Sequence, residues 1–157
     1  MNSADLVVTI LTPSDEPAWQ AYVNSHPYAT IYHTLDWRDI LYSEYRFEPV
    51  YLMAKDNERV VGVFPLFLVK NLRGRRLISL PFSIYGGPLA ETDSVTEVLL
   101  GRCVGIVREV KAGYVEIKPA SRIECAERIG FETLEWGTGT VMDLGIGFKK
   151  SLETRFP

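Results

Sequence analysis

The chain has 157 residues, of which 46% are hydrophobic and 24% are charged, with 12 glycines and 9 prolines. This size fits one ordinary domain with a sizeable core, and the composition excludes disordered, collagen-like and low-complexity chains. The net charge of −3 argues against a protein whose whole surface binds nucleic acid or anionic lipid. A local basic patch stays compatible with this charge.

The cysteines and histidines are few and far apart. Cys103 and Cys125 have no CxxC spacing, and His26 and His33 are too few for a histidine-rich metal site. We therefore expect two reduced, buried thiols, no metal, and a cytoplasmic protein. The longest apolar run, 60–69, is about half of what a membrane span needs, so no membrane crossing is predicted.

The first 45 residues predict a strand followed by two helices. Residues 5–11 are rich in β-branched side chains, as strands are. A Thr-Pro-Ser-Asp-Glu segment then starts a helix that ends near residue 25. Thr34 is a suitable cap for a second helix over 35–45, whose apolar residues recur at three- and four-residue spacing.

The middle of the chain predicts a hairpin, a strand and a shaped loop. Residues 50–54 and 59–69 form the arms of the expected hairpin, and Pro65 implies a bulge or a sheet edge because proline cannot donate to the ladder. A strand is expected over 76–80. Residues 81–88 contain too many turn residues for regular structure and predict a loop.

The C-terminal half predicts a long helix and then short elements. Thr92 or Asp93 caps a helix through Glu109 with one apolar stripe, and Gly130 is expected as a left-handed cap. The remaining predicted elements are strand 114–117, helix 123–129, and strands 131–136 and 139–144. The element order contains no repeat and no linker, which indicates one mixed α/β (α+β) sheet domain.

Two segments connect this order to a known superfamily. The order of strands and helices resembles the GCN5-related N-acetyltransferase (GNAT) fold, a mostly antiparallel mixed sheet flanked by helices. Residues 124–131, ECAERIGF, resemble the segment in which such enzymes leave their last helix and enter the next strand.

A second resemblance is more specific. Residues 76–88, with 62–67 and 29–37 upstream, together resemble the first half of FemAB-like proteins, relatives of the aminoacyl-transferases that build peptidoglycan cross-bridges. Such proteins carry two GNAT-like domains in tandem. The resemblance implies that residues 1–145 are a FemAB-type N-terminal domain, and that 146–157 begin a helix or a linker to a second GNAT-like domain. A homodimer is the other expected way to complete the molecule.

The donor of the acyl group stays open. GNAT enzymes hold the pyrophosphate of acyl-coenzyme A on a glycine-rich loop that opens a helix, with the pattern Gln/Arg, two residues, Gly, one residue, Gly/Ala. The nearest match, 71–76, departs at both ends and leads into a strand, so the pattern fails. FemAB-like relatives use aminoacyl-tRNA, so acyl-CoA and aminoacyl-tRNA are both possible donors.

The densest basic cluster consists of Lys70, Arg73, Arg75 and Arg76. A solvated turn that protects the sheet edge from pairing is the simpler interpretation. The functional interpretation is a phosphate contact, to a nucleotide-linked sugar or a tRNA end, for which Arg73 and Arg75 are candidates.

The predicted loop supplies Ser83, Tyr85, Gly86 and Gly87 as candidate substrate-binding residues. Paired glycines permit positive φ and close backbone approach to a ligand, and the Tyr and Ser hydroxyls can hydrogen-bond. A purely structural turn is the alternative.

His33 and Trp37 are the last candidates for substrate binding, because four-residue spacing lets them share a face. A half-buried packing pair is the more common outcome. In the peptidoglycan-building relatives a Gln stands near the position of His33, and a Lys stands four residues after the Trp. The chain has Leu41 at that second position, which disfavours a nucleotide-muramyl peptide as the substrate.

These observations predict a FemAB-related N-acyltransferase domain, incomplete alone, that helps transfer an acyl or aminoacyl group to an amine of a cell-envelope or polysaccharide precursor. No catalytic residue is assigned. The alternatives are a non-catalytic binding or dimerisation module on the same scaffold, and a small stand-alone acetyl-CoA-dependent N-acetyltransferase.

Overall fold

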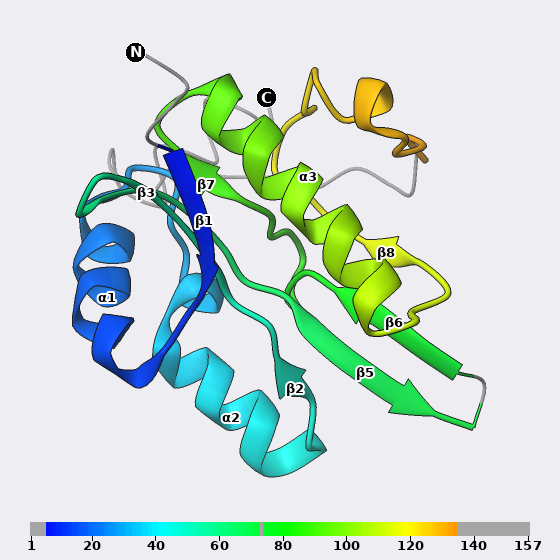
Figure 1. Ribbon diagram of the computed structural model, residues 1–157. Helices are drawn as coiled ribbons and strands as arrows, with labels where there is room; N and C mark the ends of the chain where they lie inside the picture. Colours follow the sequence, from blue (N-terminus) through cyan, green and yellow to red (C-terminus); the bar gives the residue numbers. More distant parts are fainter. Residues whose placement is uncertain (1–5, 73, 135–157) are drawn as a thin grey trace, which may run out of the picture.

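The structure is a computed structural model that describes residues 6–72 and 74–134 (Figure 1). Its strands are arranged in two four-stranded sheets, in the orders β1-β3-β4-β7 and β2-β5-β6-β8. The elements are β1 (Leu6–Ile10), η1 (Pro13–Asp15), α1 (Glu16–Ser25), η2 (Ile31–His33), α2 (Leu35–Tyr45), β2 (Glu48–Pro49), β3 (Leu52–Asp56), β4 (Arg59–Phe64), β5 (Phe67–Asn71), β6 (Gly74–Ile78), β7 (Leu89–Ala90), α3 (Asp93–Glu109), β8 (Val115–Glu116) and η3 (Glu127–Ile129).

The three predicted long helices are confirmed, and their caps explain their bounds. The Thr34 hydroxyl accepts from the Trp37 amide at the start of α2, and Arg46 ends that helix in left-handed backbone at φ 56°. Thr92 caps α3 in the same way. The predicted apolar face of α2 is only partly buried. Leu41 is in the core, whereas Tyr45 is 53% exposed.

The expected strand over 59–69 is wrong as a single element. It ends at Phe64, and β5 starts at Phe67, so that the chain leaves the first sheet and enters the second. Pro65 therefore lies at the passage between sheets rather than at a bulge or edge. The bulge of the β3–β4 hairpin lies instead where the register shifts between Ala54 and Lys55.

The second sheet is mixed, as predicted. β6 pairs antiparallel with β5 and parallel with β8, and α3 forms the crossover that a parallel connection requires (Figure 1). β7 pairs with β4 of the first sheet. The chain thus passes from the second sheet back to the first through the loop at 79–88, before α3 begins.

The C-terminal predictions hold only in part. The strand expected over 114–117 is limited to β8, and the helix expected over 123–129 is limited to the 3-10 turn η3. Gly130 does end that turn in left-handed backbone, at φ 97°. Residues 131–134 form no strand, and the rest of the strand predicted there, together with 139–144, lies outside the described residues.

The core consists of two apolar layers, one on each side of the sheets. The first lies between the sheets and α3, and includes Leu68, Leu77, Leu99 and Ile106. The second lies between the sheets and the α1–α2 side. Alternation along each strand assigns neighbouring residues to opposite layers.

α3 approaches the first sheet closely at Gly62. A Cβ added to Gly62 would lie 2.6 Å from the Cγ1 atom of Val95 and 3.1 Å from the Cδ1 atom of Leu99. Only a glycine therefore permits this contact between α3 and β4.

Both thiols are free and buried, as expected, and burial raises the pKa of Cys103 to about 12. Among the helices within 6–72 and 74–134, none has the length and apolar content to cross a bilayer.

Candidate functional site

The loop between β6 and β7 has an unusual backbone for its sequence. Leu80 and Phe82 are both left-handed, at φ 55° and 63°, a conformation that costs bulky residues roughly 1–2 kcal/mol each. The Leu80 side chain is fully buried. The Ser83 amide and hydroxyl both donate to the Leu80 carbonyl, at 3.2 and 2.6 Å. Burial and these hydrogen bonds offset the strain and fix the loop.

The paired glycines attach this loop to the segment after β8. The Gly86 amide donates to the Lys118 carbonyl at 2.5 Å, and a Cβ on Gly86 would lie 2.5 Å from the Cδ1 atom of Leu80. Gly87 has φ 151° and lies against Pro119. Both glycines are buried, whereas Tyr85 is half-buried. Close backbone approach thus occurs here between two parts of the chain, and contact of this loop with a ligand stays a prediction.

His33 contacts the same loop. Its side chain is buried, with only 3% exposed. Its Nδ1 atom accepts from the Thr30 amide at 3.2 Å and lies 2.9 Å from the Thr30 hydroxyl. The ring also hydrogen-bonds the Gly87 backbone. Because Nδ1 is an acceptor, the neutral ring carries its proton on Nε2, which donates to that backbone. Burial lowers the pKa of His33 to about 4, against the opposing effect of the Gly87 hydrogen bond.

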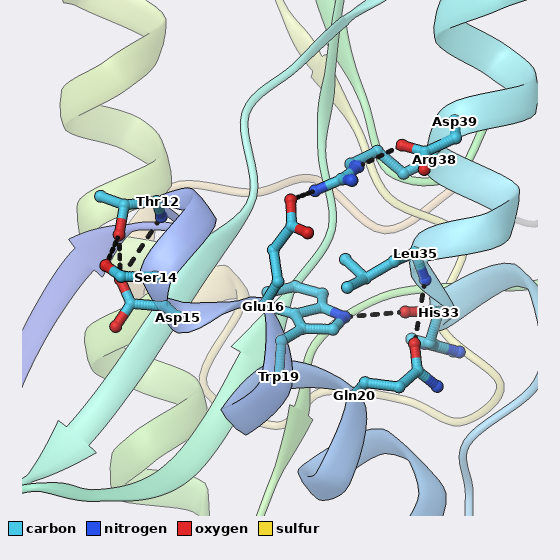
Figure 2. Close-up of polar contacts among 10 residues, drawn as sticks. All are labelled: Thr12, Ser14, Asp15, Glu16, Trp19, Gln20, His33, Leu35, Arg38 and Asp39. Carbon is cyan, nitrogen blue, oxygen red and sulfur yellow. Dashed lines mark hydrogen bonds and ion pairs between the residues drawn. The ribbon is translucent and has the colours of Figure 1, made fainter.

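The backbone of His33 is held by α1. The Trp19 indole donates to the His33 carbonyl at 2.9 Å, and the Gln20 side chain accepts from the Leu35 amide at 3.2 Å (Figure 2). About one turn away in each helix, Arg38 of α2 donates to Glu16 of α1 at 2.6 Å. The predicted site residue His33 therefore connects the α1–α2 region to the glycine loop.

Trp37 does not share a contact with His33. Its ring packs edge-on against Tyr32, with centroids 5.1 Å apart. The indole nitrogen is buried and, within the described chain, has no hydrogen-bond partner. Binding of a substrate by Trp37 stays a prediction.

The basic cluster is largely engaged in structural contacts. Lys70 pairs with Glu48 at 2.6 Å, and Arg75 donates to the Val110 carbonyl at the end of α3 at 3.1 Å. Arg73 lies outside the described residues. Lys70 and Arg75 are paired near the turn between β5 and β6, whereas Arg76 is one residue closer to the loop at 79–88. A phosphate contact by Arg73 or Arg75 stays a prediction.

Three aromatic rings that the sequence did not single out meet beside the loop. Tyr45 ends α2, Phe47 precedes β2, and Phe82 belongs to the loop. The ring centroids lie 5.4 Å apart for Tyr45 and Phe47, 4.7 Å for Tyr45 and Phe82, and 6.0 Å for Phe47 and Phe82. We call this set the aromatic platform. The available signal was a Phe in a Gly- and Pro-rich loop, but its meeting with Tyr45 depends on the tertiary fold.

A shallow hollow of about 240 Å³ is lined by residues from the end of α1 and from the α1–α2 connection. Its polar lining includes Asn24, Thr30 and Thr34, whose side chains already hydrogen-bond within the chain. No group of three His, Cys, Asp or Glu residues within the described parts of the chain is placed to hold a metal.

Comparison with known proteins gives the fold. No protein-family model matches the chain, and no curated protein matches it. Solved structures do match. A GNAT family acetyltransferase from Staphylococcus aureus has a TM-score of 0.57 at 9% identity, covering 88% of this chain and 99% of its own. The aminoglycoside 6'-N-acetyltransferase of Acinetobacter haemolyticus has a TM-score of 0.58 at 9% identity, covering 87% and 98%.

A third match, AAC(6')-Iy, was solved with a bisubstrate analogue that contains coenzyme A. It has a TM-score of 0.59 at 9% identity and covers 88% of this chain and 98% of its own. The chain therefore has the GNAT fold, a mixed α/β architecture with largely antiparallel sheets between helices. At these identities the likeness shows the fold alone.

The helix starts of this chain do not fit the pyrophosphate of coenzyme A. Each described α-helix has an acid in its first turn, namely Glu16, Asp36 and Asp93. At α3 the Thr92 hydroxyl already accepts from the Val95 amide, and Glu91 precedes the cap. A pyrophosphate placed there would face two carboxylates and would lack a glycine to let it approach. We therefore derive no chemical step through coenzyme A bound at these helices.

Proposed function

We propose that this chain is a FemAB-related domain of a GNAT-superfamily N-acyltransferase, and that it binds the amine-bearing acceptor. The observation that carries the proposal is the GNAT fold over 87–88% of the chain, shared with proteins that acetylate amines. The aminoglycoside acetyltransferase supports an acceptor whose amine is carried by a sugar. A cell-envelope or polysaccharide precursor is such an acceptor.

The acids at the helix starts support a division of labour. If the donor is not held by this domain, it is held by a second GNAT-like domain or by a second copy of the chain. The coenzyme A analogue bound to AAC(6')-Iy supports acyl-CoA as the donor. Aminoacyl-tRNA as donor is supported by the FemAB resemblance alone.

The loop at 79–88 is the proposed wall of the acceptor site. It carries the candidates Ser83, Tyr85, Gly86 and Gly87, and His33 holds it through Gly87. Acyl transfer needs an amine that is deprotonated and aligned with an acyl carbon, and donors for the oxyanion. We assign neither role to a described side chain, and we place this domain's contribution in holding the acceptor.

One observation favours the second candidate, a non-catalytic module. The same carboxylates that exclude a pyrophosphate also remove the main site for a donor, as expected for a scaffold that has lost catalysis.

Calorimetric titrations distinguish these functions. We expect saturable binding of primary amines, tested as glucosamine and lysine amide, weaker binding of their N-acetylated forms, and no saturable binding of acetyl-CoA. One-to-one binding of acetyl-CoA would support the stand-alone acetyltransferase instead. Absence of binding by every amine and by acetyl-CoA would leave the non-catalytic module.

A further inference from the structure

The aromatic platform is exposed in a way that does not help the chain fold. Phe82 is 61% exposed and Tyr45 is 53% exposed, and Ile84, two residues after Phe82 in the chain, is 75% exposed. Phe82 also has left-handed backbone. Such a residue lowers the stability of the fold through its left-handed backbone and also through the apolar surface that it leaves in water. Strain of this kind, held in place by a rigid loop, is typical of binding sites.

The platform is preformed because each ring is close to an anchored part of the chain. Tyr45 and Phe47 flank the helix end at Arg46, and their rings are stacked at 26°. Phe47 and Phe82 are stacked at 27°. The loop under Phe82 is anchored by the buried Leu80 and by the Gly86 hydrogen bond to Lys118. The rings thus form a preformed surface, which lowers the entropy cost of binding.

An unpaired cation lies on the same side of the sheet. Arg76 is opposite Val69 in the β5–β6 register, and Val69 and Ile78 both belong to the core layer that Phe47 joins. By strand alternation Arg76 shares this side with Ile78. Its Nε atom is buried and, among the residues that the structure describes, has no hydrogen-bond partner. The side chain as a whole is half-buried, and its terminal nitrogens pair with no described residue, so these nitrogens favour a ligand with oxygen acceptors.

We infer that the platform of Tyr45, Phe47 and Phe82 binds a sugar ring of the acceptor, with Arg76 donating to its oxygens. This inference rests on the proposed function and names the part of the acceptor that is recognised. A sugar has an apolar C–H face that packs on aromatic rings and a rim of oxygens that accept hydrogen bonds. An amino group on that sugar, when protonated, is attracted to the ring faces as well. A purely apolar ligand would leave Arg76 unpaired.

The experiment is a titration with glucosamine, followed by amide chemical shifts, on the wild-type chain and on Phe82→Gly. Glycine adopts the left-handed φ of this position without strain, so the variant keeps the loop and loses only the ring. Leu72→Ala is the matched control, because Leu72 is fully exposed at the β5–β6 turn, at the far end of β6. We expect Phe82→Gly and Tyr45→Ala to weaken binding about fivefold, and Phe82→Tyr and Leu72→Ala to leave it unchanged.

Other ligands separate this inference from the proposed function. The platform is supported as the sugar site if glucose binds more weakly than glucosamine and if Phe82→Gly weakens the binding of glucose as well. Equal glucosamine binding by the wild type and Phe82→Gly overturns it. Binding of lysine amide without glucosamine also overturns it, while the proposed amine acceptor stands. Tighter binding of uridine would assign the platform to a nucleobase. Self-association that Phe82→Gly abolishes would assign it to a second copy of the chain.

Discussion

At the scale of single residues, burial has changed the chemistry of the side chains that the sequence singles out. His33 is a candidate ligand contact by sequence, yet its two ring nitrogens are directed to Thr30 and to the Gly87 backbone. A ring in this environment is held neutral, because protonation would remove the acceptor that Thr30 uses and would place a charge in the core. His33 therefore acts on the site through the position of the glycine loop.

The stability of the fold should depend on pH through His33. Its folded pKa of about 4 is below the ordinary 6.5, so between these values the unfolded chain binds more protons. The contribution is complete above pH 6.5 and is lost as the pH falls toward 4. We expect the free energy of unfolding to fall by about 2 kcal/mol between pH 7.5 and 5 from this group alone.

Urea unfolding of His33→Gln and of His26→Gln at several pH values tests this expectation. Glutamine does not titrate, so the pH dependence over this window should flatten in His33→Gln and persist in His26→Gln. The same pH dependence in His33→Gln and the wild type would contradict it.

At the scale of elements, the helices are the part of the structure that the sequence predicts well. Thr34 and Thr92 precede apolar periodicity, and both cap as expected, because a cap is a local interaction that composition reveals. The two-residue strands β2 and β7 could not be predicted, since their pairing with β5 and β4 depends on distant segments. The division of residues 59–69 into β4 and β5 could not be predicted for the same reason.

The site follows the same division between local and tertiary signals. Gly86 and Gly87 are visible in sequence as a shaped loop, whereas the left-handed backbone of Phe82 and its contact with Tyr45 arise only when α2 meets that loop. Arg75 is a further example, because the carbonyl that it binds is 35 residues away. The spacing of residues in the sequence does not predict a partner so far along the chain.

Arg75 closes the C-terminal end of α3, which predicts an effect on stability. Arg75→Met removes its hydrogen bond to the Val110 carbonyl at an exposed site, and we expect a loss of up to about 1 kcal/mol in urea unfolding. Lys70→Met is the matched control on the paired strand, since its exposed ion pair with Glu48 contributes about 0.5 kcal/mol or less. Unchanged stability of Arg75→Met, together with weaker binding of inorganic phosphate, would favour the phosphate contact instead.

At the scale of the whole molecule, α3 packs against both sheets. The packing at Gly62 sets the distance between α3 and β4. Gly62→Ala would place a methyl group 2.6 Å from Val95 Cγ1, so α3 must shift or Val95 must change rotamer. We expect a loss of about 1–3 kcal/mol in thermal or urea unfolding.

A second glycine of α3 provides the opposite case. A Cβ on Gly101 meets nothing within 4 Å, and Gly101 lies in the interior of the helix. Gly101→Ala should therefore raise stability by about 0.5–1 kcal/mol. Equal effects of the two substitutions would show that helix propensity, rather than the approach of α3 to β4, governs both positions.

The passage of one continuous segment from the first sheet to the second has a consequence for how the molecule comes apart. β4 and β5 are separated only by Pro65 and Leu66, and Leu66 is fully buried. Each core layer also contains side chains from both sheets, so we expect the two sheets to unfold together. A destabilising substitution in one sheet should therefore also destabilise the other sheet, including the loop that carries the aromatic platform.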